Sequence, residues 1–192
     1  MLAFWAGVAS AKPAQSTRYT YYTIRGDTAA KVYASMMKRG PRVNGAKAYA
    51  STLATTTQNG KLSQGAYCRI EDYRLKLDFV IRLPKIKNER VLPPAERKRW
   101  QQFSAFLKVH EETHREIWLG CAADLERQVK SIKAKSCSEA DRKANQLWEG
   151  IRAACNKKHT AFDIAEQKRL MKHPFVKLVY NRSAATHGAG AQ

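Results

Sequence analysis

The sequence predicts an α+β fold, in which a small twisted antiparallel sheet with one short helix packs on a long two-helix hairpin. The first half of the chain is rich in aromatic and β-branched segments, and apolar and charged residues alternate from Tyr73 to Phe79. The second half contains two long segments with apolar residues at three- and four-residue spacing. A short connection at residues 133–137 separates these segments, as expected for a helical hairpin.

The elements of the first half follow from composition and from turn residues. We expect, in order, a strand at 19–24, a helix at about 28–38, a turn at Asn44-Gly45, a strand at 48–57, a loop at 59–65 and a strand at 66–83. Asp27 is the expected cap of the short helix, and Gly40-Pro41 its end. Pro84 is expected to end the third strand.

The two helices of the expected hairpin each carry an apolar stripe. The first helix starts near Pro94, and its stripe contains Trp100, Phe103, Leu107, Ile117, Cys121 and Leu125. The second starts near Ser138, which forms with Asp141 a pattern similar to a capping box. Its expected inward residues are Ala144, Leu147, Ile151, Cys155 and Phe162.

The first long helix contains an H-E-x-x-H string at His110-Glu111-Glu112-Thr113-His114. Histidines four residues apart lie on one helical face, so both can bind one metal ion. They fall on the stripe expected to be buried, where a shared metal would give each imidazole a partner. The alternative is a pair of buried histidines without metal, with Glu111 in a helix ion pair.

This motif predicts a zinc-dependent hydrolase with a zincin-like fold. Glu111 stands in the position of the general base that assists the attack of zinc-bound water. A secreted or periplasmic metallopeptidase is the favoured function, and a peptidoglycan amidase fits the motif equally well.

Catalytic zinc takes three protein ligands, so one ligand is expected outside the motif. No further histidine follows His114 at the metzincin spacing. If the hairpin turns near residue 135, residues in the high 150s and low 160s lie opposite the motif. That window offers His159 and Asp163, with Glu166 one turn beyond, and spacing does not choose among the three.

Several motifs occur in an order that resembles a known family: Tyr22–Gly26 with Thr28, Arg39-Gly40-Pro41, Arg82-Leu83-Pro84, Trp100 with the H-E-x-x-H string, and Phe162-Asp163. The order is similar to that of a bacterial family of secreted, predicted zinc-dependent proteases, domain of unknown function 922. The resemblance covers the chain from about Tyr19 to Lys168 and implies that Asp163 is the third zinc ligand. In that family Thr and then His-Gly follow the aromatic-Asp pair. Here Glu166 and Lys168 replace them, so Glu166 is the substitute candidate.

The four cysteines, Cys68, Cys121, Cys137 and Cys155, include no C-x-x-C pair, which disfavours a structural zinc knot. They can form two disulfides in three connectivities. We favour Cys68–Cys137 and Cys121–Cys155, because the latter two would face each other across the helical hairpin. Four free, buried thiols are the alternative. In the resembled family, one cysteine in the third strand and one near the start of the second helix match Cys68 and Cys137.

The chain begins with the apolar stretch MLAFWAGVASA, which is too short to span a bilayer. Because Ala9-Ser10-Ala11 fits the small-x-small cleavage rule, we interpret residues 1–11 as the remnant of a secretory signal peptide. The basic residues that usually precede such a stretch are missing, and an apolar tail is the alternative. We expect one catalytic domain at 12–170, a basic tail at 171–192, and a periplasmic or secreted location, which suits disulfides.

The formal net charge is +19, which predicts attraction to polyanions. No zinc finger, RNP string or Gly-rich phosphate loop is present, so no specific nucleic-acid partner is expected. The alternative function is a non-catalytic, basic envelope protein that binds anionic polymers or lipid head groups and keeps zinc for structure. A solvated basic surface without a specific partner explains the charge equally well, and we expect a monomer.

Overall fold

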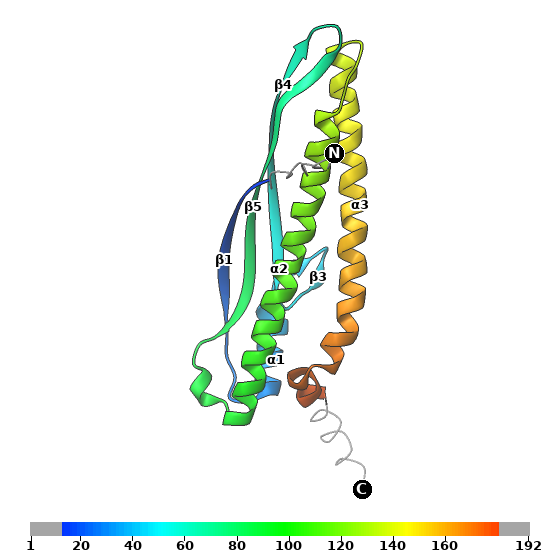
Figure 1. Ribbon diagram of the computed structural model, residues 1–192. Helices are drawn as coiled ribbons and strands as arrows, with labels where there is room; N and C mark the ends of the chain where they lie inside the picture. Colours follow the sequence, from blue (N-terminus) through cyan, green and yellow to red (C-terminus); the bar gives the residue numbers. More distant parts are fainter. Residues whose placement is uncertain (1–12, 181–192) are drawn as a thin grey trace, which may run out of the picture. The chain divides into compact units, whose positions relative to one another are not determined.

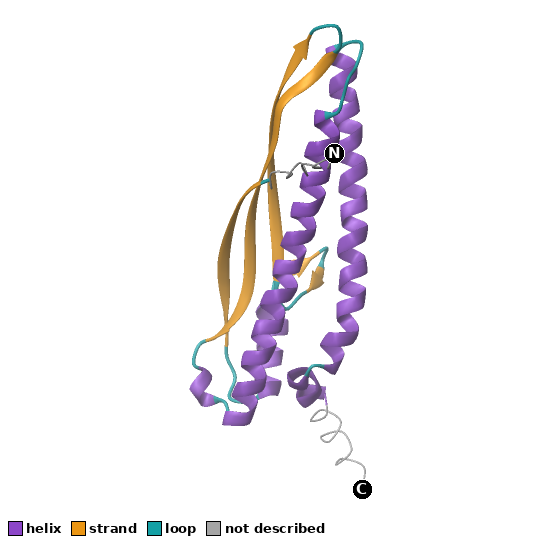
Figure 2. Cartoon of the chain, viewed as in Figure 1, coloured by secondary structure: helices purple, strands orange, loops and turns teal. Residues whose placement is uncertain are grey.

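The computed structural model describes residues 13–180, which form an α+β fold (Figures 1 and 2). The elements are β1 (Ala14–Ile24), α1 (Ala29–Arg39), β2 (Arg42–Val43), β3 (Ala46–Lys47), β4 (Ser51–Gln64), β5 (Cys68–Ile86), the short 3₁₀ helix η1 (Glu89–Val91), α2 (Pro94–Lys130) and α3 (Cys137–Lys172). The predicted α+β class is confirmed, whereas a zincin-like fold stays a prediction. None of the described helices combines the length and the apolar character needed to cross a bilayer. The predicted signal peptide at 1–11 lies outside the described residues.

The main sheet has the strand order β1-β5-β4 and is mixed, so the prediction of an antiparallel sheet is wrong. The Thr20 hydroxyl donates to the Ile81 carbonyl at 3.4 Å, and the Lys87 N–H donates to the Ile24 carbonyl at 3.0 Å. Because these contacts advance in the same direction along both strands, β1 runs parallel to β5. The chain between them passes through α1 and β4, a crossover long enough for parallel pairing.

Three predicted boundaries in this half are wrong. The side chain of Thr28, not Asp27, caps α1 by accepting the Lys31 N–H, while Asp27 forms an ion pair with the Lys31 amine. The predicted loop at 59–65 lies largely within β4, because this segment pairs with β5. Strand β5 continues past Pro84 to its end at Ile86. A proline is tolerated in a strand where no partner requires its missing N–H.

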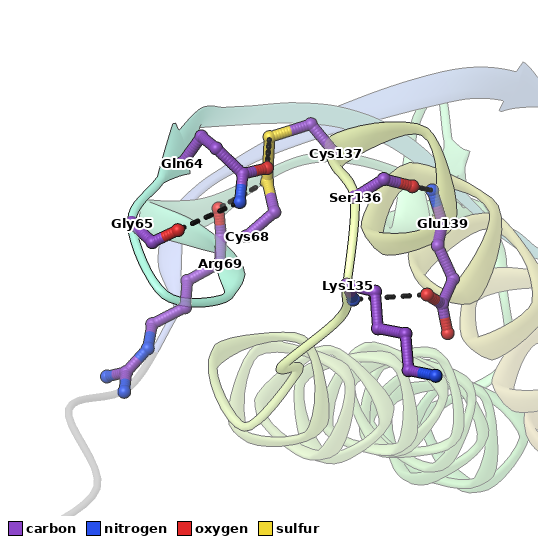
Figure 3. The surroundings of a disulfide bond; sticks show 8 residues. All are labelled: Gln64, Gly65, Cys68, Arg69, Lys135, Ser136, Cys137 and Glu139. Atoms are coloured by element: carbon purple, nitrogen blue, oxygen red, sulfur yellow. Dashed lines mark hydrogen bonds between the residues drawn. A yellow bond between two sulfur atoms is a disulfide. The ribbon is translucent and has the colours of Figure 1, made fainter.

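The start of α3 also differs from the prediction. The Ser136 hydroxyl accepts the Glu139 N–H at 3.2 Å, and the Glu139 carboxylate accepts the Lys135 N–H at 3.1 Å (Figure 3). The cap therefore involves Ser136 and Glu139 instead of Ser138 and Asp141. A serine followed three residues later by glutamate satisfies the first free N–H groups of a helix.

Contacts divide the chain into two compact units, which are described separately. Unit 1 contains the described part of Met1–Ser16, with Thr55–Asp78 and Ile117–Asn156; unit 2 contains Thr17–Ala54, Phe79–Glu116 and the described part of Lys157–Gln192. Strands β1, β4 and β5 and helices α2 and α3 contribute residues to both units, so the division does not correspond to consecutive domains. One catalytic domain at 12–170 stays a prediction.

Unit 1 is cross-linked by two disulfides, Cys68–Cys137 and Cys121–Cys155, and the predicted connectivity is confirmed. Figure 3 shows the first of these bonds, which joins β5 to the beginning of α3. Next to it, Cys68 and Ala134 exchange two main-chain hydrogen bonds of 2.8 and 3.0 Å. Disulfides of this kind persist in oxidising compartments, which is consistent with an exported protein.

Unit 2 is organised around a buried apolar cluster rich in aromatic rings. Trp100 and Phe103 of α2 are at most 1% exposed, and both contact Phe175 at ring-centroid distances of 5.5 and 5.0 Å. Residues 174–180 are helical, and Val176 and Val179 are buried together with Phe175. A surface tail therefore does not begin at residue 171, because this apolar segment packs into the core; residues 181–192 lie outside the described part.

Candidate metal centre

The H-E-x-x-H string lies in the segment of α2 that belongs to unit 2. Helical spacing places His110 and His114 one turn apart on the same face. Their side chains are 19% and 15% exposed, and Glu111 is 5% exposed. The motif therefore faces the interior of unit 2, as its position on the apolar stripe predicted.

Three ligand atoms converge at this face. His110 Nε2 and His114 Nε2 are 3.1 Å apart. Asp163 Oδ1, from α3, lies 3.3 Å from the first nitrogen and 3.0 Å from the second. The Asp163 side chain is 54% exposed, so the cluster borders solvent. Among the described residues, these three side chains form the group with metal-ligand spacing.

The spacing of the three atoms fits a zinc ion. Zinc bonds of about 2.0–2.1 Å to imidazole and carboxylate place neighbouring tetrahedral ligands about 3.3 Å apart. The measured separations of 3.0 to 3.3 Å are close to this value. Two imidazoles and one carboxylate are also a donor set that zinc commonly takes. The residues present therefore fit the metal that the sequence predicted.

The other two candidates for a third ligand are placed elsewhere. The Glu166 carboxylate is buried and accepts a hydrogen bond of 2.7 Å from the Arg169 guanidinium. His159 Nδ1 lies 2.8 Å from His114 Nδ1, which is the ring nitrogen facing away from Asp163. Neither side chain contributes an atom to the three-atom cluster.

Glu111 is held by a residue of β4. Thr52 Oγ1 lies 2.8 Å from Glu111 Oε2 and 2.9 Å from the Glu111 carbonyl oxygen, so its single proton can donate to either. Burial raises the pKa of Glu111 to about 7; the Thr52 hydrogen bond opposes this shift, and the negative charge of Asp163 adds to it. Near neutral pH the carboxyl can therefore both accept and release a proton.

The two motif histidines are kept neutral by their surroundings. Burial lowers the pKa of His110 and of His114, although the negative charge of Asp163 opposes the shift. The neutral imidazole is the form that binds metals. The Phe162 ring stacks on His110 at a centroid distance of 4.8 Å and meets His114 edge-on at 5.1 Å, so it restricts both rings.

Sequence reasoning missed Thr52 and the contacts of Glu112. Glu112 accepts hydrogen bonds from the Tyr19 hydroxyl and the Lys108 amine, which hold the exposed side of the motif. Thr52 and Tyr19 are 59 and 93 positions away from their partners, and no local pattern connects such distant residues. Phe162 did carry a signal, because it precedes Asp163 in the aromatic-Asp pair.

Comparison with known protein families shows to which family the chain belongs. The family model described as "Bacterial protein of unknown function (DUF922)" matches residues 19–171, a range that includes every residue of the candidate centre. The chain belongs to this family. No curated protein and no solved structure matched the chain. The DUF922 description states no activity, so the chemistry has to be inferred from the side chains of the site.

Proposed function

We propose that this DUF922 protein is a zinc-dependent hydrolase of the bacterial envelope that cleaves peptide bonds. The convergence of His110 Nε2, His114 Nε2 and Asp163 Oδ1 carries the proposal. Structural zinc sites are generally closed by four protein ligands, whereas catalytic sites use three and keep one position open. Three ligand atoms converge among the described residues, and the exposed Asp163 gives the cluster a side toward solvent.

Glu111 supplies the proton transfer in this proposal. When bound, zinc would acidify a water molecule and polarise the scissile carbonyl. Glu111 would take the proton of that water and deliver it to the leaving amine. Thr52 engages one carboxylate oxygen, Oε2, so Oε1 is the oxygen that would accept this proton.

The test uses the purified full chain, with zinc content measured by elemental analysis and hydrolysis of casein measured in parallel. We expect one zinc per chain and cleavage that a chelator abolishes. Glu111→Gln should retain zinc and lose about 10²–10⁴-fold in rate, the usual contribution of a general base. Glu116→Gln is the matched control, because Glu116 is an exposed glutamate of the same helix segment. Equal rates for both variants would contradict the role of Glu111.

The net charge of +19 supports a second candidate function, a non-catalytic envelope protein that binds anionic polymers or lipid head groups. If this second function is correct, the protein should bind zinc but hydrolyse neither casein nor peptidoglycan peptides. It should also bind an anionic polymer, and this binding should weaken steeply as the salt concentration rises. Polymer binding that is insensitive to salt would exclude it.

The proposed location, periplasmic or secreted, is supported by the two disulfides. It is tested by expressing the full chain in a bacterium and fractionating the cells. We expect the protein outside the cytoplasm, with an amino terminus generated by cleavage after Ala11. A full-length, reduced protein in the cytoplasm would contradict this part of the proposal.

A further inference from the structure

The contact between His114 and His159 is not explained by metal binding alone. His159 comes from α3, and its Nδ1 lies 2.8 Å from His114 Nδ1. The two rings are tilted by 35° with centroids 5.0 Å apart, a geometry set by the nitrogen–nitrogen contact and not by face-to-face stacking. His159 is also half-buried, so the contact lies inside unit 2.

The two nitrogens of His114 have different neighbours. Nε2 lies 3.1 Å from His110 Nε2 and 3.0 Å from Asp163 Oδ1. Nδ1 points the other way, to His159. A neutral imidazole carries one N–H, and the nitrogen that binds a metal must present its lone pair. If Nε2 is the ligand, the proton of His114 must therefore sit on Nδ1.

We propose that His159 is a positioning residue that accepts the Nδ1–H of His114 and so directs the Nε2 lone pair of His114 toward the metal. This inference rests on the proposed zinc site. The acceptor is the Nδ1 lone pair of His159, so the proton of His159 belongs on its own Nε2. One hydrogen bond thus fixes the tautomer of both rings and the orientation of the ligand ring. Carboxylates and carbonyls usually take this part at metal sites.

The experiment compares two substitutions that differ in one property. In His159→Asn the side-chain oxygen stands at the same branch position as Nδ1 and keeps an acceptor. In His159→Leu a methyl group of similar size stands there and accepts nothing. Zinc affinity is measured by competition with a chromophoric chelator. We expect His159→Leu to lose about 10–100-fold in affinity, the usual effect of removing such a partner, and His159→Asn to lose much less.

Three controls separate positioning from other roles. Lys158→Ala, an exposed neighbour on α3, should leave zinc affinity unchanged. His114→Ala should lose far more affinity than His159→Leu, because it removes a ligand. With cobalt in place of zinc, His159→Leu should keep the visible spectrum of the wild-type ligand set. An equal loss in the Leu and Asn variants, or an altered cobalt spectrum in both, would overturn the inference.

A proton measurement distinguishes failure of this inference from failure of the zinc proposal. In the zinc-loaded wild-type protein, the Nδ1–H proton of His114 should resonate downfield and exchange slowly with water, because His159 accepts it. In zinc-loaded His159→Leu this proton should move upfield and exchange faster. If the wild-type protein binds no zinc, the zinc proposal fails and this inference fails with it. If zinc binds and the His114 proton behaves alike in the wild type and in His159→Leu, the positioning role alone is wrong.

Discussion

The two units of this protein are stabilised in different ways. All four cysteines lie in unit 1, where two disulfides join β5 to α3 and α2 to α3. Unit 2 contains no cysteine, and it holds the aromatic cluster and every residue of the candidate metal centre. Unit 1 therefore has covalent links in addition to apolar packing, whereas unit 2 is held by apolar packing and, in our proposal, also by a metal ion.

The largest expected effect comes from breaking one of the two disulfides of unit 1. The bond between Cys68 and Cys137 closes a loop with a sequence separation of 69. Replacing both cysteines by serine should lower the free energy of unfolding by about 4 kcal/mol, because the unfolded chain is released from this loop. Hydrogen exchange should report lost protection in unit 1, with zinc affinity unchanged. If the double-serine variant folds but loses zinc affinity, the disulfide of unit 1 and the metal site of unit 2 are not independent.

The buried Glu111 carboxyl of unit 2 should change the free energy of unfolding by about 3 kcal/mol between low and high pH. The pKa of Glu111 is raised to about 7 in the folded chain from 4.5. The folded protein therefore keeps a proton that the unfolded chain releases, so the stability contributed by Glu111 falls as pH rises through this window.

The comparison of wild type with Glu111→Gln isolates this effect, because all other titratable groups are present in both proteins. In the presence of a chelator, the variant should gain stability relative to the wild type between about pH 4 and pH 8. Glu116→Gln, at an exposed position of the same helix, is the matched control. The measurement is urea denaturation at a series of pH values, and a difference independent of pH would refute the environment described for Glu111.

The smallest effect is expected from Thr52, which links β4 to the motif. Thr52→Val keeps the shape of the side chain and removes the hydrogen bond to Glu111, which should cost about 1 kcal/mol. Because this bond lowers the pKa of Glu111, its loss should also raise that pKa further. Thr57→Val, at an exposed position of the same strand, is the matched control in thermal denaturation.

The sequence predicted the parts of the fold that local patterns determine. The boundaries of α2 and the disulfide Cys121–Cys155 followed from apolar spacing and from the idea of a hairpin. The direction of β1 relative to β5 did not, because parallel and antiparallel strands can have the same composition, and the pairing depends on a long connection. The buried segment at 174–180 was missed because basic residues in residues 168–177 suggested a solvent-exposed tail.

The residues of the candidate site also differ in how far local sequence patterns predicted them. His110, Glu111 and His114 were evident because helical periodicity alone brings them together. Spacing left Asp163 as one of three candidates, since the rotation of α3 about its axis decides which side chain approaches the motif, and only the family resemblance singled it out. Thr52 gave no signal at all, because a strand residue reaches Glu111 only through tertiary packing. Local spacing thus identifies the motif, whereas the positions of its partner side chains depend on the tertiary structure.

Zinc stoichiometry tests the central claim most directly. The purified wild-type chain, stripped with a chelator and dialysed against zinc, should bind one ion per chain with an affinity that survives gel filtration. Asp163→Asn should lose most of this affinity, and Asp141→Asn, an exposed acid of the same helix, should keep it. A wild-type chain that takes up no zinc, or an Asp163→Asn variant that binds as tightly as the wild type, would contradict the account.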